Sequence, residues 1–259
     1  MNKILLILAV MFWLLKILEL PCASQDKDAI FQTSTINALS RGVYDGDVSY
    51  KDLKKYGDFG LGTFNGLDGE MVALDGKFYQ IKADGKAYPV VDSMKTPFAV
   101  VTFFEPDRTI LANKTINYEK LQNYLDSLIP SNNIFYSIRV EGLFKYIKLR
   151  SVPNQKKPYT PLADVLKNEK VFEFNEIKGT AVGFRMPGYI QGVNVPGYHL
   201  HFITEDKKLG GHLLDCYIED VRIEIDLSSY LYMALPSNTE FLEADLSKDD
   251  KINSKRSGD

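Results

Sequence analysis

The sequence is poor in the residues from which metal and disulfide sites are usually built. Its 259 residues include only three histidines, two cysteines and one tryptophan. Two cysteines cannot supply a four-thiolate zinc site or a disulfide framework. Any chemistry that depends on imidazole must therefore use the same three histidines, and this restriction guides the search for a functional site.

The sequence also lacks a long basic run and a strong excess of either charge. Its formal net charge is −3, with 31 lysines and arginines against 34 aspartates and glutamates, and this balance argues against a nucleic-acid partner. Because 45% of the residues are hydrophobic, the chain is too apolar for a disordered protein and can bury a sizeable core. We expect one large domain or two small ones.

Residues 1–24 have the layout of a secretory signal peptide. A short basic start precedes an apolar run over 4–15, and the small residues Cys22-Ala23-Ser24 come before a polar stretch. The apolar run is shorter than the roughly 20 residues that span a bilayer. We therefore predict cleavage near Ser24, export, and no stable membrane association; an uncleaved anchor or a lipid-modified Cys22 are the alternatives. Cleavage leaves Cys216 as the one thiol, which we expect to be buried.

Short apolar runs and recurring turn residues favour an α+β fold with mixed or antiparallel sheets and a few helices. Helical spacing occurs over 117–128 and in part of 27–57, whereas 170–235 is rich in runs of strand length. Asp-Gly favours tight hairpin turns. Such pairs separate short apolar runs at Asp68-Gly69, Asp75-Gly76 and Asp84-Gly85.

All three histidines lie within 14 residues, at His199, His201 and His212. Residues i and i+2 of a strand face the same side, so His199 and His201 point together. A polar turn follows, and a hairpin centred just after Asp206 places His201 opposite His212, unless a bulge at Gly210-Gly211 shifts the register. We expect the three imidazoles to converge on one face.

Three histidine ligands without a fourth histidine or cysteine leave one coordination position open. An open position is typical of a catalytic zinc site, whereas structural zinc sites are closed. The histidine pattern therefore predicts a catalytic metal centre. The alternative is a solvated polar face of the hairpin, on which the histidines bind nothing.

Two further charged residues could serve a metal site. Glu70 begins a strand in which it shares an apolar face with Val72 and Leu74. A carboxylate on that face must be paired or functional; the alternative is that Glu70 lies at the solvent-exposed end of the strand. In the first case desolvation raises its pKa and makes it a usable acid or base. Arg150 closes an apolar run, where it could hold a carboxylate in bidentate geometry; a surface ion pair is the alternative.

Longer motifs surround these residues. They are Gly-Asp-Phe-Gly-Leu-Gly-Thr-Phe (57–64), Leu-Asp-Gly-Glu-Met (67–71), Leu-Arg-Ser-Val-Pro (149–153), Pro-Gly-Tyr-His-Leu-His-Phe (196–202) and Gly-Gly-His (210–212). With these motifs the chain resembles the α-acetolactate decarboxylases over nearly all of its mature length, from about Ile30 to Leu246.

The resemblance implies a zinc enzyme that converts 2-acetolactate to (R)-acetoin and carbon dioxide through a metal-stabilised enediolate. It also implies a homodimer and a small barrel-like sheet that carries the metal site. The implied zinc ligands are His199, His201 and His212. The implied active-site residues around the metal are Glu70, Thr63 and Arg150.

The same resemblance sets the expected organisation. We expect residues 25–246 to form the catalytic region, as two closely packed α/β halves that meet near 150–160, and residues 247–259 to form a charged tail. The family also places an acidic residue of the tail near the zinc, and the tail offers no glutamate for this role, only Asp249, Asp250 and Asp259.

Two rival functions remain open at this point. One is another histidine-ligated metalloenzyme with a β-fold, such as an iron dioxygenase, although those enzymes commonly add a carboxylate to a histidine pair. The other is a non-catalytic secreted binding module in which the histidines are incidental.

Overall fold

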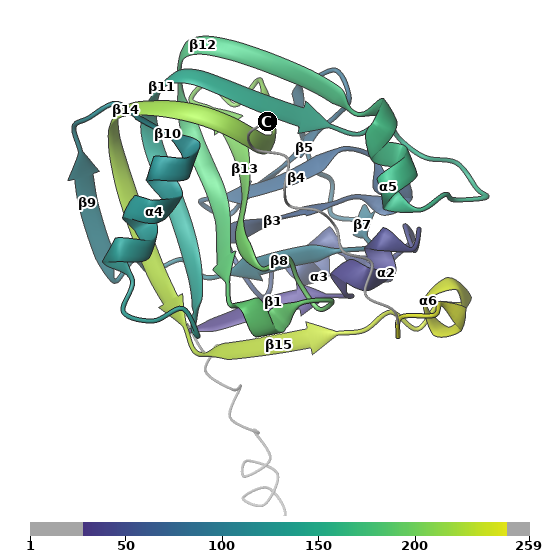
Figure 1. Cartoon of the computed structure of the whole chain (residues 1–259). Helices are drawn as coiled ribbons and strands as arrows, with labels where there is room; N and C mark the ends of the chain where they lie inside the picture. Colours follow the sequence, from purple (N-terminus) through teal and green to yellow (C-terminus); the bar gives the residue numbers. More distant parts are fainter. Residues whose placement is uncertain (1–27, 248–259) are drawn as a thin grey trace, which may run out of the picture.

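The computed structural model of the chain describes residues 28–247 (Figure 1). The predicted signal peptide with Cys22, and the tail aspartates Asp249, Asp250 and Asp259, lie outside the described residues. Within 28–247, none of the helices has the length and apolar character needed to cross a membrane.

The first of two large sheets has seven strands in the order β15-β1-β8-β3-β4-β5-β6. β1 and β15 run parallel and the other neighbours antiparallel, so the sheet is mixed. The predicted Asp-Gly pairs lie between β3 and β4, β4 and β5, and β5 and β6. The strands are β1 (Ala29–Thr33), β3 (Phe59–Thr63), β4 (Glu70–Leu74), β5 (Lys77–Ile81), β6 (Ala87–Pro89), β8 (Ala99–Thr102) and β15 (Tyr230–Ala234).

The second large sheet has six strands, all antiparallel to their neighbours. β13 pairs with both β12 and β14, and β11 also pairs with both, so these four strands form a ring of pairings. The predicted α+β class is confirmed, while the barrel-like form stays a prediction. The strands are β9 (Arg108–Ala112), β10 (Ile116–Asn117), β11 (Phe135–Ser151), β12 (Lys170–Met186), β13 (Gly197–Thr204) and β14 (Gly210–Ser228).

The remaining elements are short. A small sheet joins β2 (Val48–Ser49) to β7 (Lys95–Thr96). Ser49 caps the following helix, because its side chain accepts a hydrogen bond from the Asp52 amide. The helices are α2 (Ile36–Ser40), α3 (Tyr50–Leu53), α4 (Tyr118–Leu128), α5 (Leu162–Val165) and α6 (Thr239–Glu243), with 3-10 turns η2 (Asn65–Leu67), η3 (Leu166–Asn168) and η4 (Gly188–Ile190).

The six-stranded sheet has a different apolar cluster on each face. Helix α4 packs Leu121 and Leu125 into a cluster with Phe144, Phe202 and Cys216. Cys216 is a fully buried free thiol, as predicted. A separate cluster joins the two large sheets, and its members are Phe59, Val72, Leu74 and Ile81 from the seven-stranded sheet and Val182 and Ile203 from the six-stranded sheet.

Residues 150–160, where the sequence predicts that two halves meet, begin the connection between β11 and β12. These two strands are neighbours in the same sheet. The chain passes from the seven-stranded to the six-stranded sheet between β8 and β9, and it returns to the first sheet at β15. The chain therefore does not change sheets at 150–160, and the division into two halves stays a prediction.

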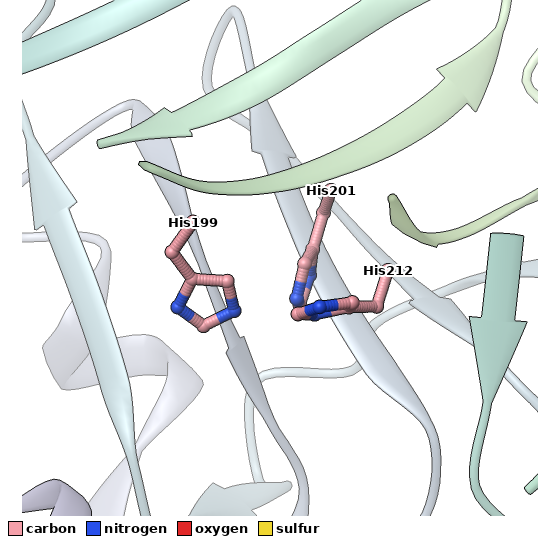
Figure 2. A group of neighbouring side chains, drawn as sticks. All are labelled: His199, His201 and His212. Atoms are coloured by element: carbon pink, nitrogen blue, oxygen red, sulfur yellow. The ribbon is translucent and has the colours of Figure 1, made fainter. Parts of the chain in front are cut away.

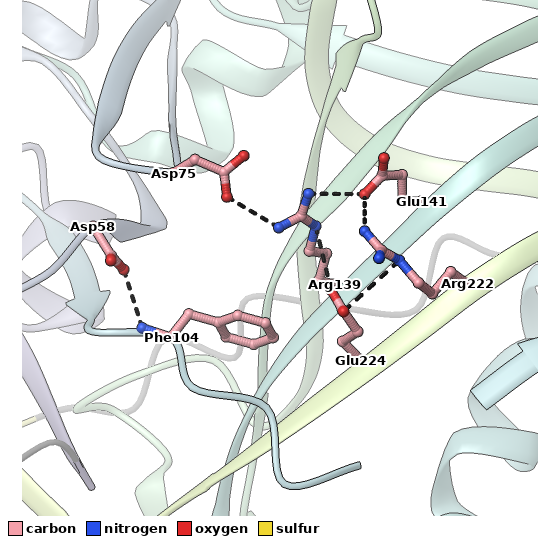
Figure 3. Close-up of polar contacts among 7 residues, drawn as sticks. All are labelled: Asp58, Asp75, Phe104, Arg139, Glu141, Arg222 and Glu224. Atoms are coloured by element: carbon pink, nitrogen blue, oxygen red, sulfur yellow. Dashed lines mark hydrogen bonds and ion pairs between the residues drawn. The ribbon is translucent and has the colours of Figure 1, made fainter. Parts of the chain in front are cut away.

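An arginine network also connects the two large sheets (Figure 3). Arg139 of β11 donates to Asp75 in the β4–β5 turn (3.0 Å) and to Glu141 (2.8 Å). Its Nε lies 3.5 Å from Glu224 of β14, and Arg222 donates to Glu141 at 2.9 Å. These ion pairs attach the β4–β5 turn to the six-stranded sheet. They lie at the end of β4 opposite to Glu70.

Candidate metal centre and active site

The three histidines lie on the β13–β14 hairpin in the predicted register. His201 is the Cα partner of His212, Phe202 of Gly211 and Ile203 of Gly210, so the two glycines do not shift the pairing. They are required for close packing: a Cβ at Gly210 would lie 2.4 Å from the Phe202 carbonyl oxygen. A Cβ at Gly211 would lie 2.7 Å from the Arg150 carbonyl oxygen. The glycines therefore let β14 lie between β13 and β11 next to His212.

The three imidazole rings converge on one point (Figure 2). One nitrogen from each ring lies within 4.8 Å of the others. His199 Nδ1, His201 Nε2 and His212 Nδ1 are buried and have no hydrogen-bond partner among the described residues. A buried polar atom without a partner is costly. Three imidazole nitrogens this close together are suited to bind one metal ion.

The environment keeps all three imidazoles neutral, as metal ligation requires. Burial and the positive charge of Arg150 lower the pKa of His199 to about 3. The pKa values of His201 and His212 lie well below the ordinary histidine value, mainly because both rings are buried. Neutral imidazole presents a lone pair to a cation, so the cluster is a set of three nitrogen donors.

The seven-stranded sheet orients the most buried ring. His201 Nδ1 lies 2.8 Å from the carbonyl oxygen of Met71 in β4. A carbonyl only accepts, so Nδ1 carries the proton and Nε2 is left as the free ligand atom. A fixed partner on the second nitrogen of this kind is usual for metal-ligating histidines.

Glu70 lies directly before Met71 and is buried, with 6% exposure. One carboxylate oxygen lies 3.5 Å from His201 Nε2 and the other 3.4 Å from Arg150 Nη1. Burial raises the pKa of Glu70 to about 7; the Arg150 charge opposes this rise and the Glu169 charge adds to it. The structure therefore places Glu70 beside the histidine cluster, inside the protein, and not at a wet strand end.

Arg150 enters the site from β11, where it is the Cα partner of His212. Its side chain is only 15% exposed, so it does not form a surface ion pair. Besides Glu70 it contacts Glu169, whose Oε2 lies 3.4 Å from Nε. Glu169 has no local sequence signal that marks it. Only the pairing of β12 with β11 brings it next to Arg150.

Thr63 of β3 is buried and is the Cα partner of Glu70. Its hydroxyl donates to the carbonyl oxygen of Gly69 at 2.6 Å, so it is directed to the turn that precedes Glu70. Gly69 has φ +83°, and a Cβ there would lie 2.1 Å from the Ile81 carbonyl oxygen, so only glycine fits this turn. That Thr63 acts directly in the reaction stays a prediction.

The arrangement combines three complementary functions. The histidines can hold a cation with a coordination position to spare. Glu70 is a buried carboxyl group whose protonation can change near neutral pH. Arg150 is a fixed guanidinium suited to a carboxylate ligand. Such a site could bind a small acid and stabilise negative charge that develops on it.

Comparisons with known proteins agree with this geometry. Residues 30–248 match the family model described as alpha-acetolactate decarboxylase. The alpha-acetolactate decarboxylase of Methanosarcina mazei is 53% identical over 219 residues, which cover 85% of this chain and 76% of that protein. The Bacillus subtilis enzyme of the same name is 42% identical over 226 residues, which cover 87% and 89%.

Solved structures give the same result. The X-ray structure of alpha-acetolactate decarboxylase from Bacillus subtilis strain 168 matches with a TM-score of 0.84 and 43% identity, covering 86% of this chain and 95% of that one. A Staphylococcus aureus protein described as similar to alpha-acetolactate decarboxylase matches with a TM-score of 0.81 and 29% identity, covering 83% and 93%. The chain therefore belongs to the alpha-acetolactate decarboxylase family and is a carboxy-lyase.

Proposed function

We propose that this protein is a zinc-dependent decarboxylase that converts 2-acetolactate to (R)-acetoin and carbon dioxide. The observation that carries the proposal is the convergence of three imidazole rings, with one nitrogen of each ring within 4.8 Å of the others. Family membership supplies the substrate, because the relatives are named for it.

Zinc is proposed because the donor set consists of three imidazole nitrogens. Catalytic zinc is commonly held by three such ligands with the fourth position open, whereas non-haem iron oxygenases use two histidines and a carboxylate. When bound by His199, His201 and His212, zinc would act as a Lewis acid that stabilises the enediolate left by the loss of carbon dioxide.

Arg150 is the proposed binding group for the substrate carboxylate. Its guanidinium carries a fixed positive charge and presents N–H donors to a carboxylate. Two protein carboxylates already hold it, so it is fixed before the substrate arrives. Fixing the guanidinium in advance avoids the entropy that ordering it during the reaction would require.

Glu70 is the proposed proton donor. Loss of carbon dioxide leaves a carbon that must gain one proton to become acetoin, and arginine is a poor donor because a guanidinium does not release its proton under ordinary conditions. The carboxyl group of Glu70 lies beside His201 and can deliver the proton to one face of the intermediate, then regain a proton from water. Delivery from one side yields one enantiomer. Thr63 supports this role by fixing the turn at Gly69.

The decisive experiment measures acetoin colorimetrically from racemic acetolactate with the purified protein. We expect activity that a chelator abolishes and added zinc restores, with stoichiometric zinc by elemental analysis. Absence of acetoin after zinc reconstitution would reject the proposed reaction. Stoichiometric iron without zinc would reject the proposed metal and favour an iron enzyme.

Export and dimerisation belong to the same proposal. The layout of residues 1–24 supports removal of a signal peptide near Ser24, and the family resemblance supports a homodimer. N-terminal sequencing of the secreted protein should find a start close to residue 25, and sedimentation should give twice the chain mass. A protein that retains Met1 in the membrane, or one that sediments as a monomer, would contradict the respective part.

A further inference from the structure

Two carboxylates from different parts of the chain contact Arg150: Glu70 at the start of β4 and Glu169 directly before β12. Its Nη1 lies 3.4 Å from Glu70 Oε1, and its Nε lies 3.4 Å from Glu169 Oε2. The three side chains are mostly buried, with exposures of 15% for Arg150, 8% for Glu70 and 21% for Glu169. Contacts at two different nitrogens of a planar group fix its rotation as well as its position.

The backbone around Glu169 is fixed by local structure. Glu169 ends the 3-10 turn η3, where its amide donates to the Leu166 carbonyl at 3.3 Å. The next residue, Lys170, begins β12 and pairs with Ser151, and Val171 pairs with Arg150. The turn and the sheet therefore hold the Glu169 carboxylate beside the guanidinium, and a flexible surface loop is not involved.

The contacts of Arg150 leave one part of the guanidinium for a ligand. Among residues 28–247, the ion pairs of Arg150 use Nη1 and Nε. Nη2 takes part in neither pair, so its N–H groups are the ones available to a substrate carboxylate. If Glu169 did not hold Nε, Glu70 would be the one anionic partner of the guanidinium, and the side chain could rotate to place two nitrogens on Glu70.

We propose that Glu169 is a positioning residue that holds Arg150 so that Nη2 faces the carboxylate of the substrate. The inference rests on the proposed function, since it assigns the substrate carboxylate to Arg150. Glu169 itself touches neither substrate nor metal in this proposal. Glu169 prevents Arg150 from rotating to place two nitrogens on Glu70. Its negative charge also compensates the positive charge of the mostly buried guanidinium.

The test compares Glu169→Gln and Glu169→Ala with the unaltered protein. Glutamine keeps the size and places a carbonyl oxygen beside Nε without the charge, so it should impair binding less than alanine does. A mostly buried ion pair is worth enough that its loss should raise KM for acetolactate by about tenfold in Glu169→Ala, with a smaller rise in Glu169→Gln. Because the lost contact serves binding of the ground state, kcat should change less than KM.

A second readout does not need turnover. The dissociation constant of 2-hydroxyisobutyrate, an α-hydroxy carboxylate that has no ketone, should rise in parallel with KM by calorimetry. Zinc content should stay at one per chain, because the histidines do not contact Glu169. The matched control is Glu173→Gln on β12, whose carboxylate pairs with Lys148 at 3.6 Å and is 54% exposed; it should leave both constants unchanged.

The outcomes separate the two proposals. If the unaltered protein makes no acetoin, the proposed function fails, while the calorimetric comparison still tests Glu169. If the unaltered protein is active and Glu169→Gln and Glu169→Ala keep its KM and dissociation constant, the positioning role is overturned. If Glu169→Ala does not fold, the isosteric Glu169→Gln decides alone, and unchanged constants in that variant overturn the inference.

Discussion

Replacing Glu70 by glutamine tests whether this carboxyl group moves the proton. Glutamine has nearly the same shape, and its carbonyl oxygen can still accept from Arg150 Nη1, where the present distance is 3.4 Å. The three imidazole nitrogens that would hold the metal come from β13 and β14, whereas Glu70 comes from β4. The substitution therefore removes an exchangeable acidic proton and keeps the metal donors.

The expected loss follows from the role of the group. A positioned acid or base usually contributes a rate factor of about 10²–10⁴, which corresponds to about 3–5 kcal/mol of activation free energy. We expect Glu70→Gln to lower kcat by that factor, with zinc content unchanged. KM should change less than kcat, because the contact that binds the substrate carboxylate is assigned to Arg150.

The assay is acetoin formation, with zinc measured on the same samples. The matched control is Glu224→Gln, which also neutralises a mostly buried glutamate between two arginines, since Glu224 lies 3.5 Å from Arg139 and 3.7 Å from Arg222. This control should keep its kcat, because its network lies at the opposite end of β4. A fully active Glu70→Gln with normal zinc would refute the assignment of Glu70 as proton donor.

Three further predictions concern stability. A ligand at about 100 times its dissociation constant stabilises the fold by about 2.7 kcal/mol, so removing the metal with a chelator should lower Tm by about 5–10 °C. If the chelator lowered the Tm of His199→Ala by the same amount, the effect would not be due to the metal. Burial and nearby carboxylates raise the pKa of Asp226 to about 7, so its proton stabilises the fold at low pH and this stability is lost as pH rises through 7. Asp226→Asn should therefore gain about 1–2 kcal/mol over the unaltered protein at pH 8 and nothing at pH 4 in urea titrations, and parallel pH profiles would contradict this. Arg139→Met should cost about 1–3 kcal/mol, because it leaves Glu224 with one weaker partner; an unchanged denaturation midpoint would show that the network is not stabilising.

Features that depend on neighbouring residues could be predicted from the sequence. Ser49 caps α3, and the Asp-Gly pairs form the turns of the meander, because a few residues determine a cap or a tight turn. The His201–His212 pairing was predictable for the same reason: a short hairpin fixes its own register once the turn centre is known. The register of this hairpin is enough to place the three histidines on one face, without any contact to other parts of the chain.

Strand lengths and cross-sheet contacts could not be predicted. The sequence predicts one or two strands over 134–149 with a bend at Gly142, and it does not show that β11 is one strand that continues to residue 151. At Gly142 φ is +150° and the pairing with β14 shifts by a residue, so glycine bends the strand and does not end it. The Met71 carbonyl bond to His201 and the Glu169 contact with Arg150 join segments far apart in the chain. No local pattern encodes such contacts.

The scarcity of histidine restricts how the proposed reaction can move protons. All three imidazoles are committed to one cluster, and burial lowers their pKa values so far that they cannot exchange protons near neutral pH. Among the residues that the structure describes, the acidic group beside them is Glu70, which contacts Arg150, and Arg150 in turn contacts Glu169. A substitution at Glu169 should therefore change mainly KM, and a substitution at Glu70 should change mainly kcat. If the variants of both residues affected KM and kcat in the same ratio, the division between a carboxylate-binding arginine and a proton-donating glutamate would be wrong.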